Sequence, residues 1–217
     1  MGPISPRLIQ ALKTAVSPER WHTYEIAAGF DQDRAHALYL WNASIGQSFH
    51  YPLQSVEVCM RNAIHRALVA VYGNDWCNDP ACRGSMQSRQ DQEIADAADR
   101  RLKMYGTSAT TPQIVASLTF GFWIAILGPK YNRMIWNTHK NTVFPFLPPG
   151  TTMKEVGQTG RTIRQLRNRI FHQEPLLGGN LSGDYAAILK MISWICPDTN
   201  AWVRKNSSVP NTLRNRP

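Results

Sequence analysis

The 217-residue sequence is poor in cysteine, and the few cysteines that it has are poorly spaced for a metal site. Its four cysteines are Cys59, Cys77, Cys82 and Cys196. Four residues separate Cys77 from Cys82, and no second Cys/His pair follows, so the pattern of a zinc knuckle is missing. The spacing favours packed thiols in a reducing compartment over a disulfide framework. We therefore expect no metal and no cofactor.

Long apolar runs are also missing. The longest covers residues 114–128 and is interrupted by Ser117 and Thr119. A membrane-spanning helix needs about 20 apolar residues, so this run predicts a buried helix instead. Residues 1–20 are amphipathic without an apolar h-region, and we expect no secretory signal and a cytoplasmic protein.

The familiar nucleotide and protease motifs are absent from the sequence. It contains no P-loop, no dinucleotide fingerprint, no Gly-x-Ser-x-Gly elbow and no His-Glu-x-x-His. Nucleotide-hydrolysing enzymes and zinc proteases therefore lose support as functional classes.

Acidic residues are scarce, with 15 Asp and Glu against 24 Lys and Arg. Residues 1–150 hold 14 basic and 11 acidic side chains, a net charge of +3, while residues 151–217 hold 10 and 4, a net of +6. A localised positive field favours a polyanionic partner, most often nucleic acid. A plain solubility surplus is the alternative interpretation.

Helical periodicity dominates the chain, and we find no convincing strand alternation. It predicts an all-α domain of about eight helices over residues 1–196, followed by a polar, disordered tail over 197–217. Tyr51-Pro52 is taken as the start of one helix, 78–88 as an irregular loop and 112–128 as one continuous helix. The sequence predicts two further helices over Met153–Phe171 and Leu181–Ile195.

The segment with the strongest candidates for a functional site, residues 167–172, lies at the end of the expected helix over 153–171. Asn168 and His172 are four residues apart and share a helical face, and the long side chain of Arg167 can reach the same imidazole. His172 falls in the last turn, because Pro175 disfavours helical geometry at the residue before it. Spacing alone predicts a compact Arg–Asn–His trio at a helix C-terminus.

Such a trio suits RNA cleavage by attack of the 2′-OH on the adjacent phosphate. His172 would supply a base of near-neutral pKa, and Arg167 a fork that holds the phosphate and the charge of the transition state. Asn168 would orient one of them, and Arg164 and Arg169 would add affinity for the RNA backbone. The alternative is a basic helix whose terminal histidine simply interacts with the helix dipole.

At these residues the chain resembles the HEPN superfamily, whose signature is an Arg followed by a polar residue and then a His four to six positions after the Arg. Arg167-Asn168-x-x-x-His172 fits that signature. The surrounding sequence looks like the Abi-like branch, associated with bacterial abortive infection. Four stretches in the right order carry this likeness: Leu40-Trp41-Asn42, residues 53–64, residues 118–123 and residues 167–175.

The resemblance implies an all-helical and often dimeric protein in which the motifs of two copies face each other across a cleft. It implies endoribonuclease activity without a metal, leaving a 2′,3′-cyclic phosphate, and a toxin-like or phage-defence role. RNA, including tRNA, and an antitoxin or regulatory protein are the partners that it suggests. In this sequence Gln173 stands where Abi-like sequences often carry a second His.

A second basic segment lies earlier in the chain. His65 follows Arg61 by four residues, and Glu57 precedes Arg61 by four, so the three share one helical face. Glu57 and Arg61 suit an intrahelical ion pair that buttresses the core, and we favour this reading. Alternatively, Arg61 and His65 line the same cleft and bind phosphate.

Two functions from different classes remain after these observations. The first is a metal-independent endoribonuclease with Arg167, Asn168 and His172 as its catalytic residues. The second is a non-catalytic RNA-binding or regulatory protein that uses the same basic helix.

Overall fold

The computed structural model describes residues 4–217, which form a single all-α domain. The first three residues of the domain expected over 1–196 lie outside the described residues. Twelve α-helices occur in residues 4–217, more than the eight expected, and no strand occurs there. The helices are α1 (Pro6–Val16), α2 (Pro18–Ala27), α3 (Gln32–Tyr72), α4 (Pro80–Ser85), α5 (Ser88–Tyr105), α6 (Thr111–Ser117), α7 (Phe120–Ile126), α8 (Asn137–Val143), α9 (Met153–Phe171), α10 (Leu181–Ile195), α11 (Pro197–Asn206) and α12 (Val209–Arg214).

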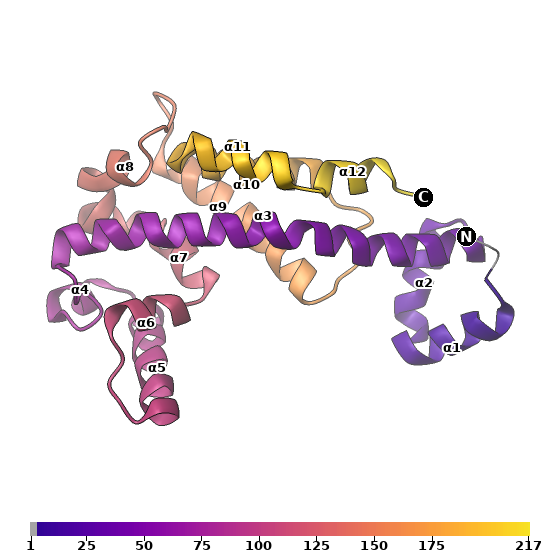
Figure 1. The fold of residues 1–217 in the computed structure, drawn as a ribbon, viewed down its shortest axis with the longest axis horizontal. Coiled ribbons are helices and arrows are strands. Elements are labelled where there is room, and N and C mark those ends of the chain that lie inside the picture. Colours follow the sequence, from indigo (N-terminus) through magenta and orange to yellow (C-terminus); the bar gives the residue numbers. More distant parts are fainter. Residues whose placement is uncertain (1–3) are drawn as a thin grey trace.

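Helix α3 runs along the length of the molecule and organises the other elements around it (Figure 1). The Asp31 side chain accepts a hydrogen bond from the Arg34 amide at its start, and Gly73 ends it with a φ of 83°. Pro52 lies inside this helix and does not begin a new one, which corrects the sequence-based prediction. Pro52 cannot donate a backbone hydrogen bond, and it is tolerated where it is buried against the core.

Three further boundaries differ from the expectation. The expected loop over 78–88 contains α4, which Asp79 caps by accepting the amide of Cys82. The expected helix over 112–128 is broken into α6 and α7, because Leu118 adopts an extended backbone and the Thr119 side chain caps a new start. A 3₁₀ turn (Pro129–Tyr131) and a π-helical turn (Asn132–Trp136) then lead into α8.

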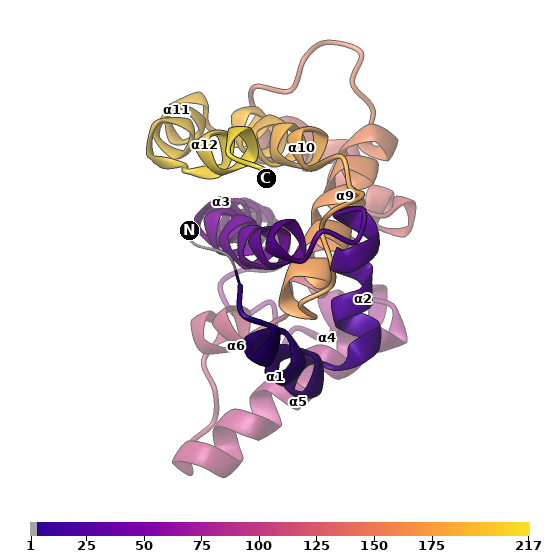
Figure 2. The same ribbon diagram turned by 90° about the vertical axis from the view of Figure 1, so that its right-hand side faces the viewer.

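The expected disordered tail is also wrong, because residues 197–217 fold into α11 and α12. Val203 and Val209 are fully buried, and the indole Nε1 of Trp41 donates to the carbonyl of Thr212 at 2.9 Å. The segment is polar overall, but it is amphipathic, and its few apolar residues reach the core. Both helices lie above α3 in Figure 1, and Figure 2 shows them beside α10.

Helix α9 has the predicted bounds, and local interactions fix both of its ends. Thr152 and Glu155 form a capping box at its start. At its end the amides of Gln173 and Glu174 donate to the carbonyls of Ile170 and Arg169, which is a Schellman motif. Gln173 occupies the left-handed position of that motif with a φ of 56°, where glycine is usual.

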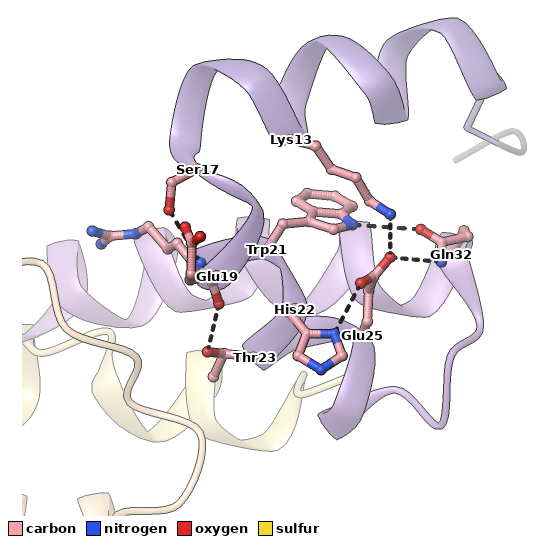
Figure 3. A network of polar contacts seen from close by, with 9 residues as sticks. Lys13, Ser17, Glu19, Trp21, His22, Thr23, Glu25 and Gln32 are labelled. Atoms are coloured by element: carbon pink, nitrogen blue, oxygen red, sulfur yellow. Dashed lines mark hydrogen bonds and ion pairs between the residues drawn. The ribbon is translucent and has the colours of Figure 1, made fainter.

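Helices α1 and α2 attach to the beginning of α3 through a small separate core and one polar network. Glu25 of α2 is buried and accepts from Lys13 of α1 at 2.8 Å and from Gln32 of α3 at 3.0 Å, while His22 lies 3.3 Å away (Figure 3). These donors hold the pKa of Glu25 down at about 2. One carboxylate therefore ties three helices together.

Candidate functional site

A cleft of about 480 Å³ lies where α9 crosses α3. Its polar wall is a stripe along α3, with side chains at spacings of four, three and four residues that share one helical face. The residues of this cleft are His50, Leu53, Gln54, Glu57, Val58 and Arg61 of α3 and Arg167 and Phe171 of α9. Two arginines that lie far apart in the sequence thus meet in one hollow.

Arg167 is held in the cleft by an aromatic ring. Its guanidinium carbon lies 4.2 Å above the centre of the Phe171 ring, a cation–π contact between neighbouring turns of α9. The Nε of Arg167 is buried, with no hydrogen-bond partner among residues 4–217. A buried donor without a partner is costly. Because Arg167 also lines the cleft, its guanidinium can bind an acceptor such as a phosphate oxygen there.

Glu57 is half-buried and lines the cleft together with the two arginines. Burial raises the pKa of Glu57 above its ordinary value, and the positive charges of Arg167 and then Arg61 counteract part of that rise. The carboxylate therefore neutralises part of the positive charge of the cleft when it is ionised. The ion pair between Glu57 and Arg61 that the spacing favours does not form within residues 4–217, where the Nε of Arg61 instead donates to the side-chain oxygen of Asn62 at 3.5 Å. Glu57 acts on the two arginines through its charge, and the same charge changes the field that a phosphate would meet.

His50 places an imidazole at the mouth of the cleft. It is exposed, and its ring centre lies 6.1 Å from that of Phe171. His50 stands singly in the sequence, outside the helix predicted to begin at Tyr51-Pro52, so no sequence pattern selects it. Read across Pro52, the stripe His50–Gln54–Glu57–Arg61 is an ordinary helical pattern and could have been found.

The other members of the predicted trio lie beside the cleft. His172 is exposed, caps α9 and does not line the cleft; its amide donates to the carbonyl of Asn168 at 2.8 Å. Asn168 is half-buried on the same face of α9. The structure thus keeps Asn168 and His172 one turn apart, as predicted from spacing, and directs Arg167 toward α3.

Arg164 and Arg169 lie outside the cleft. Arg164 is half-buried over the start of α7, where a Cβ on Gly121 would come within 3.8 Å of its Nε. Arg169 donates to the carbonyl of Pro175 at 3.0 Å and pairs with Glu174 at 3.9 Å. In this structure Arg169 stabilises the turn after α9.

His65 does not line the cleft, and its side chain contacts the indole of Trp76. Its Nδ1 accepts a hydrogen bond from the Nε1 of Trp76 at 3.0 Å, which fixes the proton of the neutral ring on Nε2. Burial lowers the pKa of His65, and the neighbouring Arg66 and Arg61 lower it further. His65 is therefore a neutral, half-buried residue one turn beyond the cleft.

Comparison with known proteins adds no family to this geometry: no family model matches the sequence, and no curated protein or solved structure is significantly similar to it. Within residues 4–217 no helix is long and apolar enough to cross a membrane. In the same range, no three His, Cys, Asp or Glu side chains gather in the manner of a metal site.

Proposed function

We propose that this protein is a metal-independent endoribonuclease that works in the cytoplasm and binds RNA in the cleft between α3 and α9. One observation carries the proposal. Arg61 and Arg167 come from different helices into one open cleft. Paired arginines are suited to a phosphate that gains charge during reaction.

The proposed reaction is an internal transfer at phosphorus. A general base takes the proton of the 2′-OH, the 2′ oxygen attacks the phosphate, and the bond to the 5′ oxygen breaks as that oxygen takes up a proton. The products are a 2′,3′-cyclic phosphate and a 5′-OH. We assign His172 as the base, Arg167 as the phosphate clamp and Asn168 as the orienting group, and we add Arg61 as a second clamp and His50 as the proton donor.

The placement of His172 favours a composite site. His172 is exposed at the end of α9 and lies outside the cleft of its own chain. In a homodimer that apposes the ends of two α9 helices, the histidine of one copy would approach the cleft of the other. This supports the dimer that the HEPN resemblance implies, and with it a toxin-like or phage-defence role in which a partner protein restrains the enzyme.

The test is incubation of the wild type, His172→Ala, His50→Ala and Arg167→Ala with total bacterial RNA and tRNA in EDTA over a pH series. We expect only the wild type to leave cyclic-phosphate ends efficiently, with each histidine variant slower by about 100-fold or more, as is typical of lost general acid–base catalysis. Arg100→Ala, an exposed arginine of α5, is the matched control. Equal cleavage by the wild type and His172→Ala would reject His172 as the base.

Because His172 lies outside the cleft of its own chain, a second function is also supported, that of a protein that binds RNA without cleaving it. That function predicts RNA binding that weakens with salt, no cleavage at any pH, and loss of binding in Arg167→Ala. Mixing inactive Arg167→Ala and His172→Ala proteins separates the two, because a composite dimer regains cleavage and a binding module does not.

A further inference from the structure

A second hollow, of about 400 Å³, lies next to the cleft at the end of α9. We call it the side pocket. His50 lines both hollows, and the neighbouring residues Ile170 and Phe171 line one each. The side pocket is also lined by aromatic, amide and charged side chains, among them Arg20, Tyr24, Tyr39, Asn42, Gln173 and Glu174.

Tyr24, one of the residues that line the side pocket, carries a hydrogen-bonding group that the fold leaves unused. Tyr24 is fully buried, and its hydroxyl has no hydrogen-bond partner among residues 4–217. Burial raises the pKa of Tyr24, so the phenol stays protonated and remains a donor. Tyr39 packs edge-on against it with 5.1 Å between ring centres. A lining with two aromatic rings and a protonated hydroxyl suits a flat ring with polar edges.

The rim of the side pocket is held in place by hydrogen bonds. The side-chain oxygen of Asn42 accepts from the amide of Leu176 at 2.6 Å, which leaves the Asn42 amide nitrogen as a donor. Gln173 is kept in its left-handed conformation, and its carbonyl accepts from the guanidinium of Arg20. Figure 2 shows α2, which carries Arg20, beside the end of α9. A non-glycine residue in this conformation is strained by about 1–2 kcal/mol, and such strain is common at binding sites.

The chemistry of the side pocket fits one base better than the others. Tyr24 and Asn42 offer donors, and the exposed carboxylate of Glu174, one oxygen of which lies 3.9 Å from Arg169, offers acceptors. Among the four RNA bases only guanine presents two adjacent donors beside a carbonyl acceptor on one edge. We propose that the side pocket binds a guanine of single-stranded RNA next to the bond held in the cleft; this assignment of substrate preference rests on the function proposed above.

The first measurement is a titration of the free protein with guanosine 5′-monophosphate and adenosine 5′-monophosphate, followed by the backbone amide shifts of Gly46 and Leu176. Both residues line the side pocket, and neither lies in the cleft. We expect saturable shifts with the guanosine nucleotide and none with the adenosine nucleotide. Equal shifts with both, or none with either, would overturn the assignment to guanine.

The second measurement is cleavage of uridine oligonucleotides that carry one guanosine or one adenosine. We expect the wild type to prefer the guanosine substrate by about tenfold or more, the size of a bidentate base contact. Glu174→Gln and Ala43→Phe, which fills the pocket from an exposed position on α3, should bring that preference within about twofold. Asp99→Asn on α5 removes an exposed carboxylate elsewhere and should keep the preference.

Gln173→Gly separates recognition from folding. Glycine suits the backbone at this position, so the thermal midpoint should rise. The same change removes a side chain that lines the side pocket, so the guanosine preference should fall. A preserved preference in Gln173→Gly, Glu174→Gln and Ala43→Phe together would overturn the inference. Cleavage without base preference or nucleotide shifts would reject the pocket and keep the nuclease. Guanosine-specific shifts without any cleavage would keep the pocket and reject the nuclease, and a protein that does neither would reject both.

Discussion

The opposed charges of Glu57 and Arg167 allow a quantitative test of the cleft. Both side chains line it, so a phosphate bound there is attracted by the arginine and repelled by the carboxylate. For single-stranded nucleic acid, each neutralised phosphate contributes a slope of about −0.7 to the plot of log affinity against log salt. Between about 1 M and about 0.1 M salt, one unit of charge therefore changes the affinity about fivefold.

We expect Arg167→Gln to weaken RNA binding about fivefold near 0.1 M salt and to make the slope shallower by about 0.7. Glu57→Gln should strengthen binding by a similar factor and make the slope steeper. The double variant should return close to the wild type. Arg100→Gln and Asp99→Asn remove one charge of each sign from exposed positions of α5 that do not line the cleft, and they should alter the affinity much less.

The assay is fluorescence anisotropy with a labelled 2′-O-methyl oligonucleotide, which lacks the attacking hydroxyl and so reports binding alone. A pH series adds a second criterion. Because burial raises the pKa of Glu57, this carboxylate should take up a proton before exposed glutamates do as the pH is lowered. The wild type should then gain affinity for RNA as the negative charge of Glu57 is lost, and Glu57→Gln should lack that part of the gain. Weaker binding by Glu57→Gln, or equal effects of the cleft and α5 variants, would refute the placement of the phosphate between Arg61 and Arg167.

Three further predictions concern stability and reactivity. Glu25→Gln should lower the free energy of unfolding at neutral pH by about 1–3 kcal/mol. Because the pKa of Glu25 is held at about 2 in the folded protein, this stabilisation is fully present above the ordinary pKa near 4.5 and is lost as the pH falls through about 2. Urea titrations of the wild type and the variant over that pH range would detect the loss. Val203→Ala should cost about 1.5–2 kcal/mol in the same assay, since two methyl groups leave a fully buried site, whereas a tail detached from the core would give no change. Burial raises the pKa of Cys77 and Cys82 to about 12, while hydrogen bonds from Thr199 lower that of Cys196, so peptide mapping after brief alkylation should find Cys196 modified well before the other two.

The helix bounds show where sequence patterns suffice. The predictions for Met153–Phe171 and Leu181–Ile195 are confirmed residue for residue, because their caps and apolar periods agree. The prediction at Pro52 is wrong, because burial against the other helices supports a proline that an isolated helix would not tolerate. The prediction for 197–217 is wrong for a related reason, since Val203 and Val209 supply enough burial to order a segment that is polar overall.

For the candidate site, too, sequence patterns predict one part of the arrangement and packing sets the rest. The spacing in the sequence was enough to place Asn168 and His172 on one face and to group Glu57 with Arg61, because residues three or four apart on a helix are neighbours whatever surrounds them. It could not show that Arg61 and Arg167 share a cleft, that His65 is bound to Trp76, or that Arg169 holds the turn after α9. Those facts depend on how one helix crosses another.

The helical class, the positive charge of residues 151–217 and the polar face of each main helix follow from the amino-acid sequence alone, because all three are local properties of the chain. Which of these faces meet depends on tertiary packing. The crossing of α9 over α3 and the return of the chain through Gln173 create the cleft and the side pocket from residues more than 100 positions apart. No local period records that crossing, because it is set by the packing of the whole core.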